Sequence, residues 1–140
     1  MTLEVSKNST RILIVDDDPV VRRLLTISLN RQSGLTVCAA AENASQALEI
    51  LEKQPVDLAI VDISLNGTSG LELTERINLR WPDLLVLIFS SHNEAAYVRR
   101  AFRRGARGYV VKHLDVSEEL SGAIYEVLAG KIYVSQRISE

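Results

Sequence analysis

The sequence predicts an α/β protein with a doubly wound parallel sheet, built from five successive βα units, (βα)5. Five short apolar runs are rich in Val, Ile and Leu and lack polar alternation, which is typical of strands buried on both faces of a parallel sheet. After each run comes a stretch whose apolar residues recur at helical spacing. Because strand and helix alternate five times, we expect right-handed crossovers with helices on both faces of the sheet.

The strands are expected in the apolar runs themselves, which are residues 11–15, 35–40, 57–61, 84–89 and 108–111. The first helix is expected from Pro19 to about Gln32, because proline suits the first helical turn and Asp18 before it is a typical N-cap. The other helices are expected around apolar stripes at residues 44–51, 71–77, 95–102 and 120–128. We expect Trp81 and Pro82 to close the third helix.

The chain has 140 residues, a length typical of one domain. We expect an N-terminal tail at 1–10, the domain at 11–130 and a C-terminal tail at 131–140. The formal net charge of −2 does not indicate binding to nucleic acid or to an anionic membrane. Cys38 is the only cysteine, and no apolar run approaches the roughly 20 residues of a membrane span. These features predict a soluble, cytoplasmic protein without an internal disulfide.

Acidic residues follow two of the predicted strands. In the flavodoxin-like strand order 2-1-3-4-5, ligands bind beyond the carboxyl ends of the strands, at the point where the order reverses between the first and third. Asp16 and Asp17 end the first strand and Asp62 ends the third, so three carboxylates are expected in one crevice. Such crowding is unfavourable without a cation, and carboxylates are oxygen ligands of the kind that Mg²⁺ takes. The sequence therefore predicts a divalent metal site.

A hydroxyl and an ammonium group are expected in the same crevice. The fourth strand ends in Ser90 and Ser91, and the fifth ends in Lys112. A metal and a lysine neutralise phosphoryl oxygens, a serine donates a hydrogen bond, and one carboxylate is left as a nucleophile. This combination of side chains predicts a site that handles phosphate.

Four stretches of the chain, in this order, resemble the successive motifs of the bacterial response-regulator receiver domain: ILIVDDDPVVRRLL, LAIVDISLNGTSGLEL, VLIFSSHNE and GARGYVVK. The resemblance covers about the whole chain. The ending EVLAGKIYVS is similar to the NarL/FixJ/LuxR-type subfamily, in which the receiver precedes a helix-turn-helix domain. The resemblance implies a domain that takes part in a two-component phosphorelay.

The resemblance also implies roles for the acidic residues. Asp62 resembles the phosphoacceptor, and Asp17 resembles the direct ligand of Mg²⁺, for which Mn²⁺ is an alternative ion. Asp16 resembles its acidic neighbour, which often acts through water. The backbone carbonyl of Ser64 would complete the protein's share of the coordination.

Further roles follow from the other motifs. Ser90 resembles the switch hydroxyl, with Ser91 as the alternative, and Tyr109 resembles the switch aromatic. Lys112 resembles the lysine that binds the phosphoryl group. Positions two residues after the phosphoacceptor and two after the switch hydroxyl, here Ser64 and His92, tend to tune the lifetime of the phosphoryl group.

Two positions depart from the family pattern. His113 follows Lys112 where proline is common, so a cis peptide bond there is not expected, and Asn66 stands where the loop after the third strand often carries proline. Neither departure removes a chemical group that the proposed reaction needs.

The implied partners are a sensor histidine kinase or a phosphotransfer protein, and a second copy of the chain in a phosphorylation-dependent homodimer. The resemblance implies no enzyme beyond its own phosphorylation and dephosphorylation. DNA binding would belong to an output domain outside these 140 residues, linked through residues 131–140.

Three alternatives remain open from the sequence. Asp16 and Asp18 match the Asp-x-Asp spacing of a haloacid-dehalogenase-like Mg²⁺ phosphatase, although Asp62 would then have no role. A receiver-like binding module that signals without phosphorylation is the second alternative. A cluster of basic residues in the fourth helix is either a solvated face or a surface for a partner; its members are Arg99, Arg100, Arg103, Arg104 and Arg107.

Overall fold

The computed structural model describes residues 9–113 and 116–139 of the chain. Most of the predicted N-terminal tail and the last residue of the predicted C-terminal tail lie outside the described residues. The strands of the main sheet are β1 (Thr10–Val15), β2 (Leu35–Ala41), β3 (Leu58–Val61), β6 (Leu85–Ser90), β7 (Gly108–Val111) and β8 (Tyr133–Val134). The helices are α2 (Pro19–Asn30), α3 (Ala44–Lys53), α4 (Gly70–Arg80), α5 (Ala95–Arg103) and α6 (Val116–Leu128).

The main sheet has the order β2-β1-β3-β6-β7-β8, and every neighbouring pair is parallel. The predicted doubly wound order 2-1-3-4-5 is therefore confirmed for the five predicted strands. The structure adds a sixth strand, β8, inside the segment that was expected to be a tail. It also adds a short antiparallel hairpin of β4 (Ser64–Leu65) and β5 (Thr68–Ser69) after β3. The first helix ends at Asn30, two residues before the predicted end.

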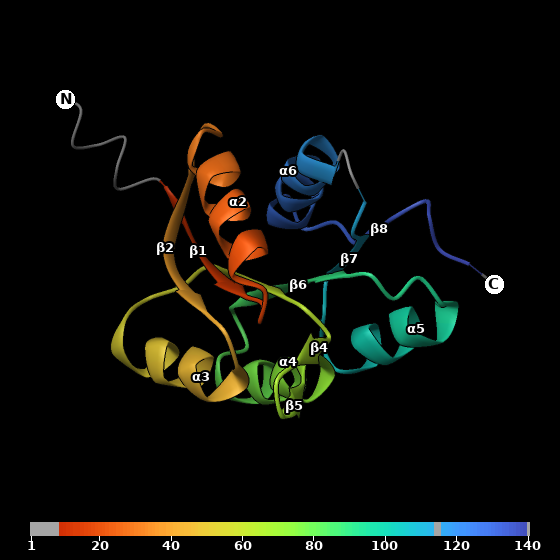
Figure 1. Cartoon of the computed structure of the whole chain (residues 1–140), viewed down its shortest axis with the longest axis horizontal. Coiled ribbons are helices and arrows are strands. Elements are labelled where there is room, and N and C mark those ends of the chain that lie inside the picture. Colours follow the sequence, from red (N-terminus) through yellow and green to blue (C-terminus); the bar gives the residue numbers. More distant parts are fainter. Residues whose placement is uncertain (1–8, 114–115, 140) are drawn as a thin grey trace.

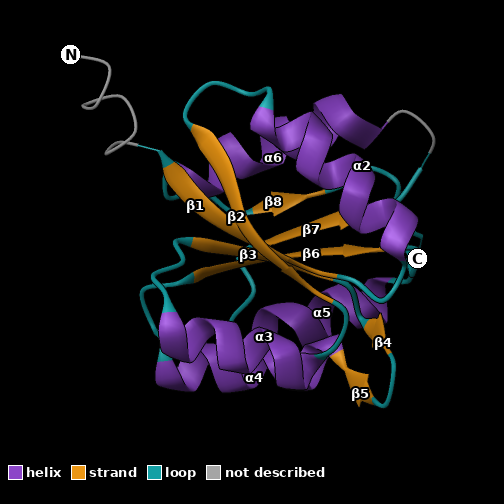
Figure 2. Ribbon diagram, turned by 60° about the vertical axis from the view of Figure 1, so that its left-hand side comes forward, coloured by secondary structure: helices purple, strands orange, loops and turns teal. Residues whose placement is uncertain are grey.

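Helices cover both faces of the sheet, as Figure 2 shows: α2 and α6 lie on one face, and α3, α4 and α5 lie on the other. The strands are buried on both faces because successive side chains point to opposite sides. In β1, Ile12 and Ile14 pack with α2 and α6, whereas Leu13 and Val15 pack with the opposite layer. This alternation explains why the strand has no polar residue between Ile12 and Val15.

Side-chain caps begin three of the helices close to the carboxyl edge of the sheet. Asp18 accepts a hydrogen bond from the Val20 backbone N–H at 2.9 Å, and Pro19 occupies the first turn, so the predicted start of α2 is confirmed. Asn43 caps α3, and Ser69 caps α4. Such caps satisfy backbone N–H groups that have no partner within the helix.

Gly70 lets α4 start directly beneath the end of β3. A Cβ atom built at Gly70 would lie 1.9 Å from the carbonyl oxygen of Asp62, which is far inside contact distance. The Gly70 N–H donates a hydrogen bond to the Ile63 carbonyl at 2.7 Å. The turn between β3 and α4 is thereby drawn tight against Asp62. Across residues 9–113 and 116–139, no helix combines the length and apolar character that a membrane crossing requires.

Candidate functional site

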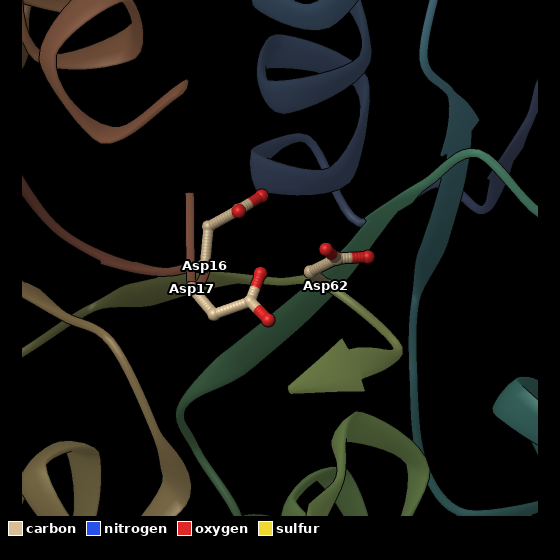
Figure 3. Close-up of side chains that lie close together, drawn as sticks. All are labelled: Asp16, Asp17 and Asp62. Carbon is tan, nitrogen blue, oxygen red and sulfur yellow. The ribbon is translucent and has the colours of Figure 1, made fainter. Parts of the chain in front are cut away.

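Three carboxylates meet at the carboxyl edge of the sheet. Asp16 and Asp17 follow β1, and Asp62 follows the neighbouring strand β3, so the parallel pairing of the two strands places all three side chains together (Figure 3). One carboxylate oxygen of each lies within 4.8 Å of the others. Asp16 and Asp62 are buried, with 2% and 7% of their surface exposed, and Asp17 is partly exposed. The structure thus brings together the acidic residues that the strand-end argument singled out.

Lys112, at the end of β7, holds two of these carboxylates. Its Nζ donates to Asp16 Oδ2 at 2.9 Å and to Asp62 Oδ2 at 3.1 Å. The ammonium group also lies 5.4 Å from the centre of the Phe89 ring, close enough for a cation–π attraction. The other oxygen of Asp16 accepts the Asp18 backbone N–H at 2.9 Å, so the Asp16 carboxylate is fixed at both oxygens.

The electrostatics of the cluster disfavour the charge on Asp62. Burial raises the pKa of Asp62 and the nearby Asp16 raises it further, while Lys112 and the Ser64 N–H lower it by less. Burial acts to lower the pKa of Lys112, but the hydrogen bond to Asp16 and the charges of both carboxylates outweigh it, and that pKa is raised. Lys112 therefore stays charged at neutral pH. Any additional positive charge nearby would stabilise the ionised form of Asp62.

The donor set fits a divalent cation. Three carboxylates face one ammonium group, so two negative charges at the site lack a compensating partner among these residues. Carboxylate oxygens are hard ligands that suit Mg²⁺ or Mn²⁺, which complete their coordination with water and phosphate oxygens. The partly exposed Asp17 leaves the cluster accessible from solvent.

Ser90 and Tyr109 lie on the neighbouring strands β6 and β7, and both are fully buried. Ser91, the alternative to Ser90, is exposed. The Tyr109 hydroxyl donates to the carbonyl of His92 at 2.7 Å, and Ser90 Oγ accepts the His92 N–H at 3.1 Å. The two predicted switch residues are thus joined through one loop residue. Burial raises the pKa of Tyr109, so its hydroxyl keeps its proton and remains a donor.

His92 has more contacts than the sequence indicated. Its ring hydrogen-bonds Ser64 Oγ at 3.1 Å and stacks on Tyr97 with the ring centres 4.3 Å apart. The two positions with predicted effects on lifetime, Ser64 and His92, therefore contact each other beside the carboxylates. No sequence pattern predicts this contact, because the two residues are 28 positions apart and only the folded backbone brings them together. The peptide bond between Lys112 and His113 is trans.

The fold and the site define a class: a flavodoxin-like α/β protein with an acidic cluster and a lysine at the topological switch point of its sheet. Residues 12–124 match the family model of the response regulator receiver domain, and the chain belongs to this family. The prediction from the sequence motifs is confirmed, and the family match favours it over the phosphatase alternative.

Among curated proteins, the chain is 36% identical over 119 residues to the Fimbriae Z protein of Salmonella typhimurium, covering 85% of this chain and 56% of that protein. It is 39% identical over 129 residues to the transcriptional activator protein ExaE of Pseudomonas putida, covering 91% and 59%. The chain thus spans less than three fifths of the length of these relatives. The chain is therefore similar to one part of each.

Solved structures show the same fold. A two-component response regulator of the LuxR family from Aurantimonas sp. SI85-9A1 superposes with a TM-score of 0.87 at 35% identity, covering 93% of this chain and 92% of that one. A CheY-like receiver domain protein from Methanospirillum hungatei JF-1 superposes with a TM-score of 0.79 at 28% identity, covering 87% and 95%. The chain is a receiver domain of the two-component type.

Proposed function

We propose that this receiver domain accepts a phosphoryl group on Asp62 from the phosphohistidine of a sensor kinase or a phosphotransfer protein. The observation that carries the proposal is the Asp62 carboxylate, held by Lys112 at 3.1 Å within a cluster of three carboxylates. A carboxylate oxygen forms a bond to phosphorus while the phosphorus–nitrogen bond of the donor breaks, and the electron pair leaves with the imidazole nitrogen. Asp16, Asp17, Asp62 and the Ser64 carbonyl would hold Mg²⁺, which supplies positive charge for the phosphoryl oxygens when bound.

The other residues of the site position the phosphoryl group and respond to it. Lys112 pairs with a phosphoryl oxygen, because its pKa is raised and it stays charged. Ser90 turns its hydroxyl toward the new oxygens, and Tyr109 follows the His92 carbonyl to which it is bonded. Ser64 and His92, which contact each other, set the access of water to the acyl phosphate and hence its lifetime.

In this proposal the domain catalyses only its own phosphorylation and dephosphorylation. It is proposed to work in the cytoplasm, together with its phosphoryl donor. The similarity to transcriptional regulators favours a DNA-binding output of the LuxR type, made by a domain beyond these 140 residues. The net charge of −2 argues against DNA binding by the receiver itself. Phosphorylation is proposed to favour a homodimer of the receiver.

Acetyl phosphate with Mg²⁺ tests the proposal without a cognate kinase. We expect a mass increase of about 80 Da, that of one added HPO₃ group, and we expect Asp62→Asn to abolish it. Asp18→Asn is the matched control, because Asp18 caps α2 and the variant keeps a capping side chain, so the mass increase should persist.

Three outcomes contradict the proposal. An unchanged mass increase in Asp62→Asn would show that another residue is the acceptor. Steady hydrolysis of phosphate monoesters would indicate the phosphatase alternative. A protein that takes up no phosphoryl group from acetyl phosphate or from any phosphohistidine donor would indicate the binding module that signals without phosphorylation.

A further inference from the structure

The C-terminal segment, residues 133–139, returns along the edge of the sheet to the loop beside the carboxylate cluster. Tyr133 N–H donates to the Arg107 carbonyl at 3.1 Å, and Ser135 N–H donates to the Tyr109 carbonyl at 2.9 Å, which sets β8 parallel to β7. Four residues later, Ser139 reaches the start of α5. In Figure 1 this segment runs from β8 past α5 to the C-terminus. The segment therefore covers the free edge of β7.

The near part of the segment, residues 133–135, is anchored to α6. Glu119 of this helix accepts hydrogen bonds from the Tyr133 hydroxyl at 2.8 Å and from Ser135 Oγ at 2.7 Å, and pairs with the His113 ring at 2.9 Å. Burial acts to raise the pKa of Glu119, but these three hydrogen bonds outweigh it, and that pKa is lowered. Ser135 is only 2% exposed. This anchor involves a partly buried, ionised carboxylate with three hydrogen-bond partners, and hydrogen bonds to an ionised group are stronger than those between neutral groups.

The far part of the segment, residues 138 and 139, is attached more weakly. Ser139 N–H donates to the Asn93 carbonyl at 2.7 Å, and its carbonyl accepts the Ala95 N–H at 3.0 Å. Ile138 is partly buried against the apolar core that lies between the sheet and the layer of α3, α4 and α5. Gln136 and Arg137, which lie between the two attachments, are exposed. The far attachment thus consists of two neutral backbone hydrogen bonds and one partly buried side chain.

The far attachment is made to the loop that the phosphoryl site controls. Asn93, which accepts from Ser139, directly follows His92. The His92 N–H is bonded to Ser90 Oγ, its ring to Ser64 Oγ, and its carbonyl to the Tyr109 hydroxyl. A phosphoryl group on Asp62 adds three acceptor oxygens within this network, and the two serine hydroxyls are the nearby donors that can turn to it. If the Ser90 hydroxyl turns to the phosphoryl group, His92 loses the acceptor of its backbone N–H; if the Ser64 hydroxyl turns, the His92 ring loses its partner.

We propose that residues 138 and 139 form a releasable contact, which opens when Asp62 takes up a phosphoryl group while residues 133–135 stay bound to Glu119. The inference rests on the proposed function. The loop at 92–94 moves as its bonds to Ser90 and Ser64 are exchanged, and the Asn93 and Ala95 partners of Ser139 move with it. Release uncovers the N-terminus of α5 and the apolar surface beneath Ile138, and it frees the chain from residue 136 onward. Through this contact, phosphorylation of Asp62 would change the surface that is exposed around α5.

Hydrogen–deuterium exchange, read on the same sample as the intact mass, tests the release. With acetyl phosphate and Mg²⁺ we expect the amide of Ser139 to exchange at least several-fold faster once the mass increase is complete, with the amides of Tyr133 and Ser135 unchanged. A fully phosphorylated protein with unchanged exchange at Ser139 would overturn the release and leave the proposed function intact. Faster exchange along the whole of 133–139 would also overturn it, because the segment would then detach as one piece.

A variant of the unphosphorylated protein tests the coupling between the loop and the segment by itself. Tyr109→Phe removes the hydroxyl that donates to His92, and we expect faster exchange of the Ser139 amide. Tyr125→Phe is the matched control, because it removes a hydroxyl that donates to the Ser33 carbonyl at the same distance of 2.7 Å, far along the chain from this loop. Equal exchange at Ser139 in both variants would refute the coupling. If neither acetyl phosphate nor a phosphohistidine donor gives a mass increase, the proposed function and the phosphoryl-driven release both fail. This pair of variants still decides the coupling.

Discussion

Asp62 carries a charge that its surroundings disfavour, and this has a consequence for stability. Its pKa is raised in the folded state by burial and by Asp16, so the folded protein holds this proton to a higher pH than the unfolded chain does. The stability that protonated Asp62 contributes is fully present below the ordinary pKa of aspartate and is lost as the pH rises through the raised value. At neutral pH the ionised group therefore costs stability.

Asp62→Asn should stabilise the fold at pH 7, because it replaces a disfavoured charge with a neutral side chain of the same shape. We expect an increase of about 1 kcal/mol in the free energy of unfolding, measured by urea denaturation without divalent ions. The gain should shrink as the pH falls below the ordinary pKa of aspartate. Asp83→Asn, on the exposed turn before β6, is the control and should change little. A loss of stability in Asp62→Asn at pH 7 would show that the pair with Lys112 outweighs the crowding.

Asp17 is the least buried of the three carboxylates and is proposed to bind the metal directly. Binding to the folded state alone raises stability, by about 1.4 kcal/mol at ten times the dissociation constant. We expect Mg²⁺ to raise the melting temperature of the unaltered protein and to do so much less in Asp17→Asn, as followed by thermal unfolding across a Mg²⁺ titration. Asp18→Asn removes the same charge one residue further on and should keep most of the response. If both variants lose the Mg²⁺-induced rise in melting temperature equally, the rise comes from general attraction of cations to negative charge and not from coordination by Asp17.

The tight start of α4 requires glycine at position 70, because there is no room for a Cβ atom. At Gly70 an added Cβ would lie 1.9 Å from the Asp62 carbonyl oxygen, and its three nearest atoms are all backbone atoms of Asp62 and Ile63, which cannot swing aside as a flexible side chain can. We expect Gly70→Ala to destabilise the fold by about 2–3 kcal/mol, as overpacking does, and to lower phosphoryl uptake because the displaced backbone is that of the acceptor. Gly122→Ala in α6 has open space around its Cβ and should instead stabilise by about 1 kcal/mol. Unchanged stability and uptake in Gly70→Ala would show that this turn relaxes freely.

The strands and helices that were predicted from the sequence are those with an apolar pattern that spans at least four residues. Unbroken apolar runs predicted five strands, since a strand buried on both faces excludes polar residues. The strand order was expected because five βα units commonly take the flavodoxin-like arrangement. The strand β8 was missed because Tyr133 and Val134 alone form no pattern, and their pairing depends on the edge that β7 leaves free. The hairpin of β4 and β5 was missed for the same reason, because each of its strands has two residues.

The site was predictable where side chains stand at strand ends, and not where contacts run through loops. Asp16, Asp17, Asp62 and Lys112 follow from the rule that parallel strands end at one edge. The contacts of His92 use its N–H and carbonyl as well as its ring, and any residue type has these backbone groups. Glu119 lies on a helix face that the apolar pattern describes only as solvent-facing, yet three partners converge on it.

The surface of the molecule offers two faces for the proposed homodimer. One is α5, where Arg99 and Arg103 are exposed and Arg104 pairs with Glu75 at 3.4 Å. The other is the layer of α2 and α6. Three apolar side chains of α2 share one side of the helix and are exposed: Val20, Leu24 and Ile27.

The layer of α2 and α6 is the better candidate for contact with a second copy. A two-fold dimer needs a surface that complements itself. Here exposed Arg23 of α2 and exposed Arg31, which follows the last residue of α2, share a layer with exposed Glu118 and Glu126 of α6. Apolar side chains that gather at helical spacing with charges around them are typical of interfaces. The arginines of α5 lack such an apolar centre, since their helix buries its apolar side.

We expect the phosphorylated protein to form a dimer that Leu24→Glu disrupts, because the new carboxylate would be buried at the centre of the interface. Sedimentation equilibrium of phosphorylated samples, with occupancy read from the intact mass, measures the dissociation constant. We expect Leu24→Glu to weaken it at least tenfold, or about 1.4 kcal/mol. Leu79→Glu on α4 is the matched control, since Leu79 is 76% exposed against 60% for Leu24 and lies on the opposite layer. If instead Arg103→Glu disperses the dimer while Leu24→Glu leaves it intact, the contact is made by α5, where the proposed release of residues 138 and 139 would then control it directly.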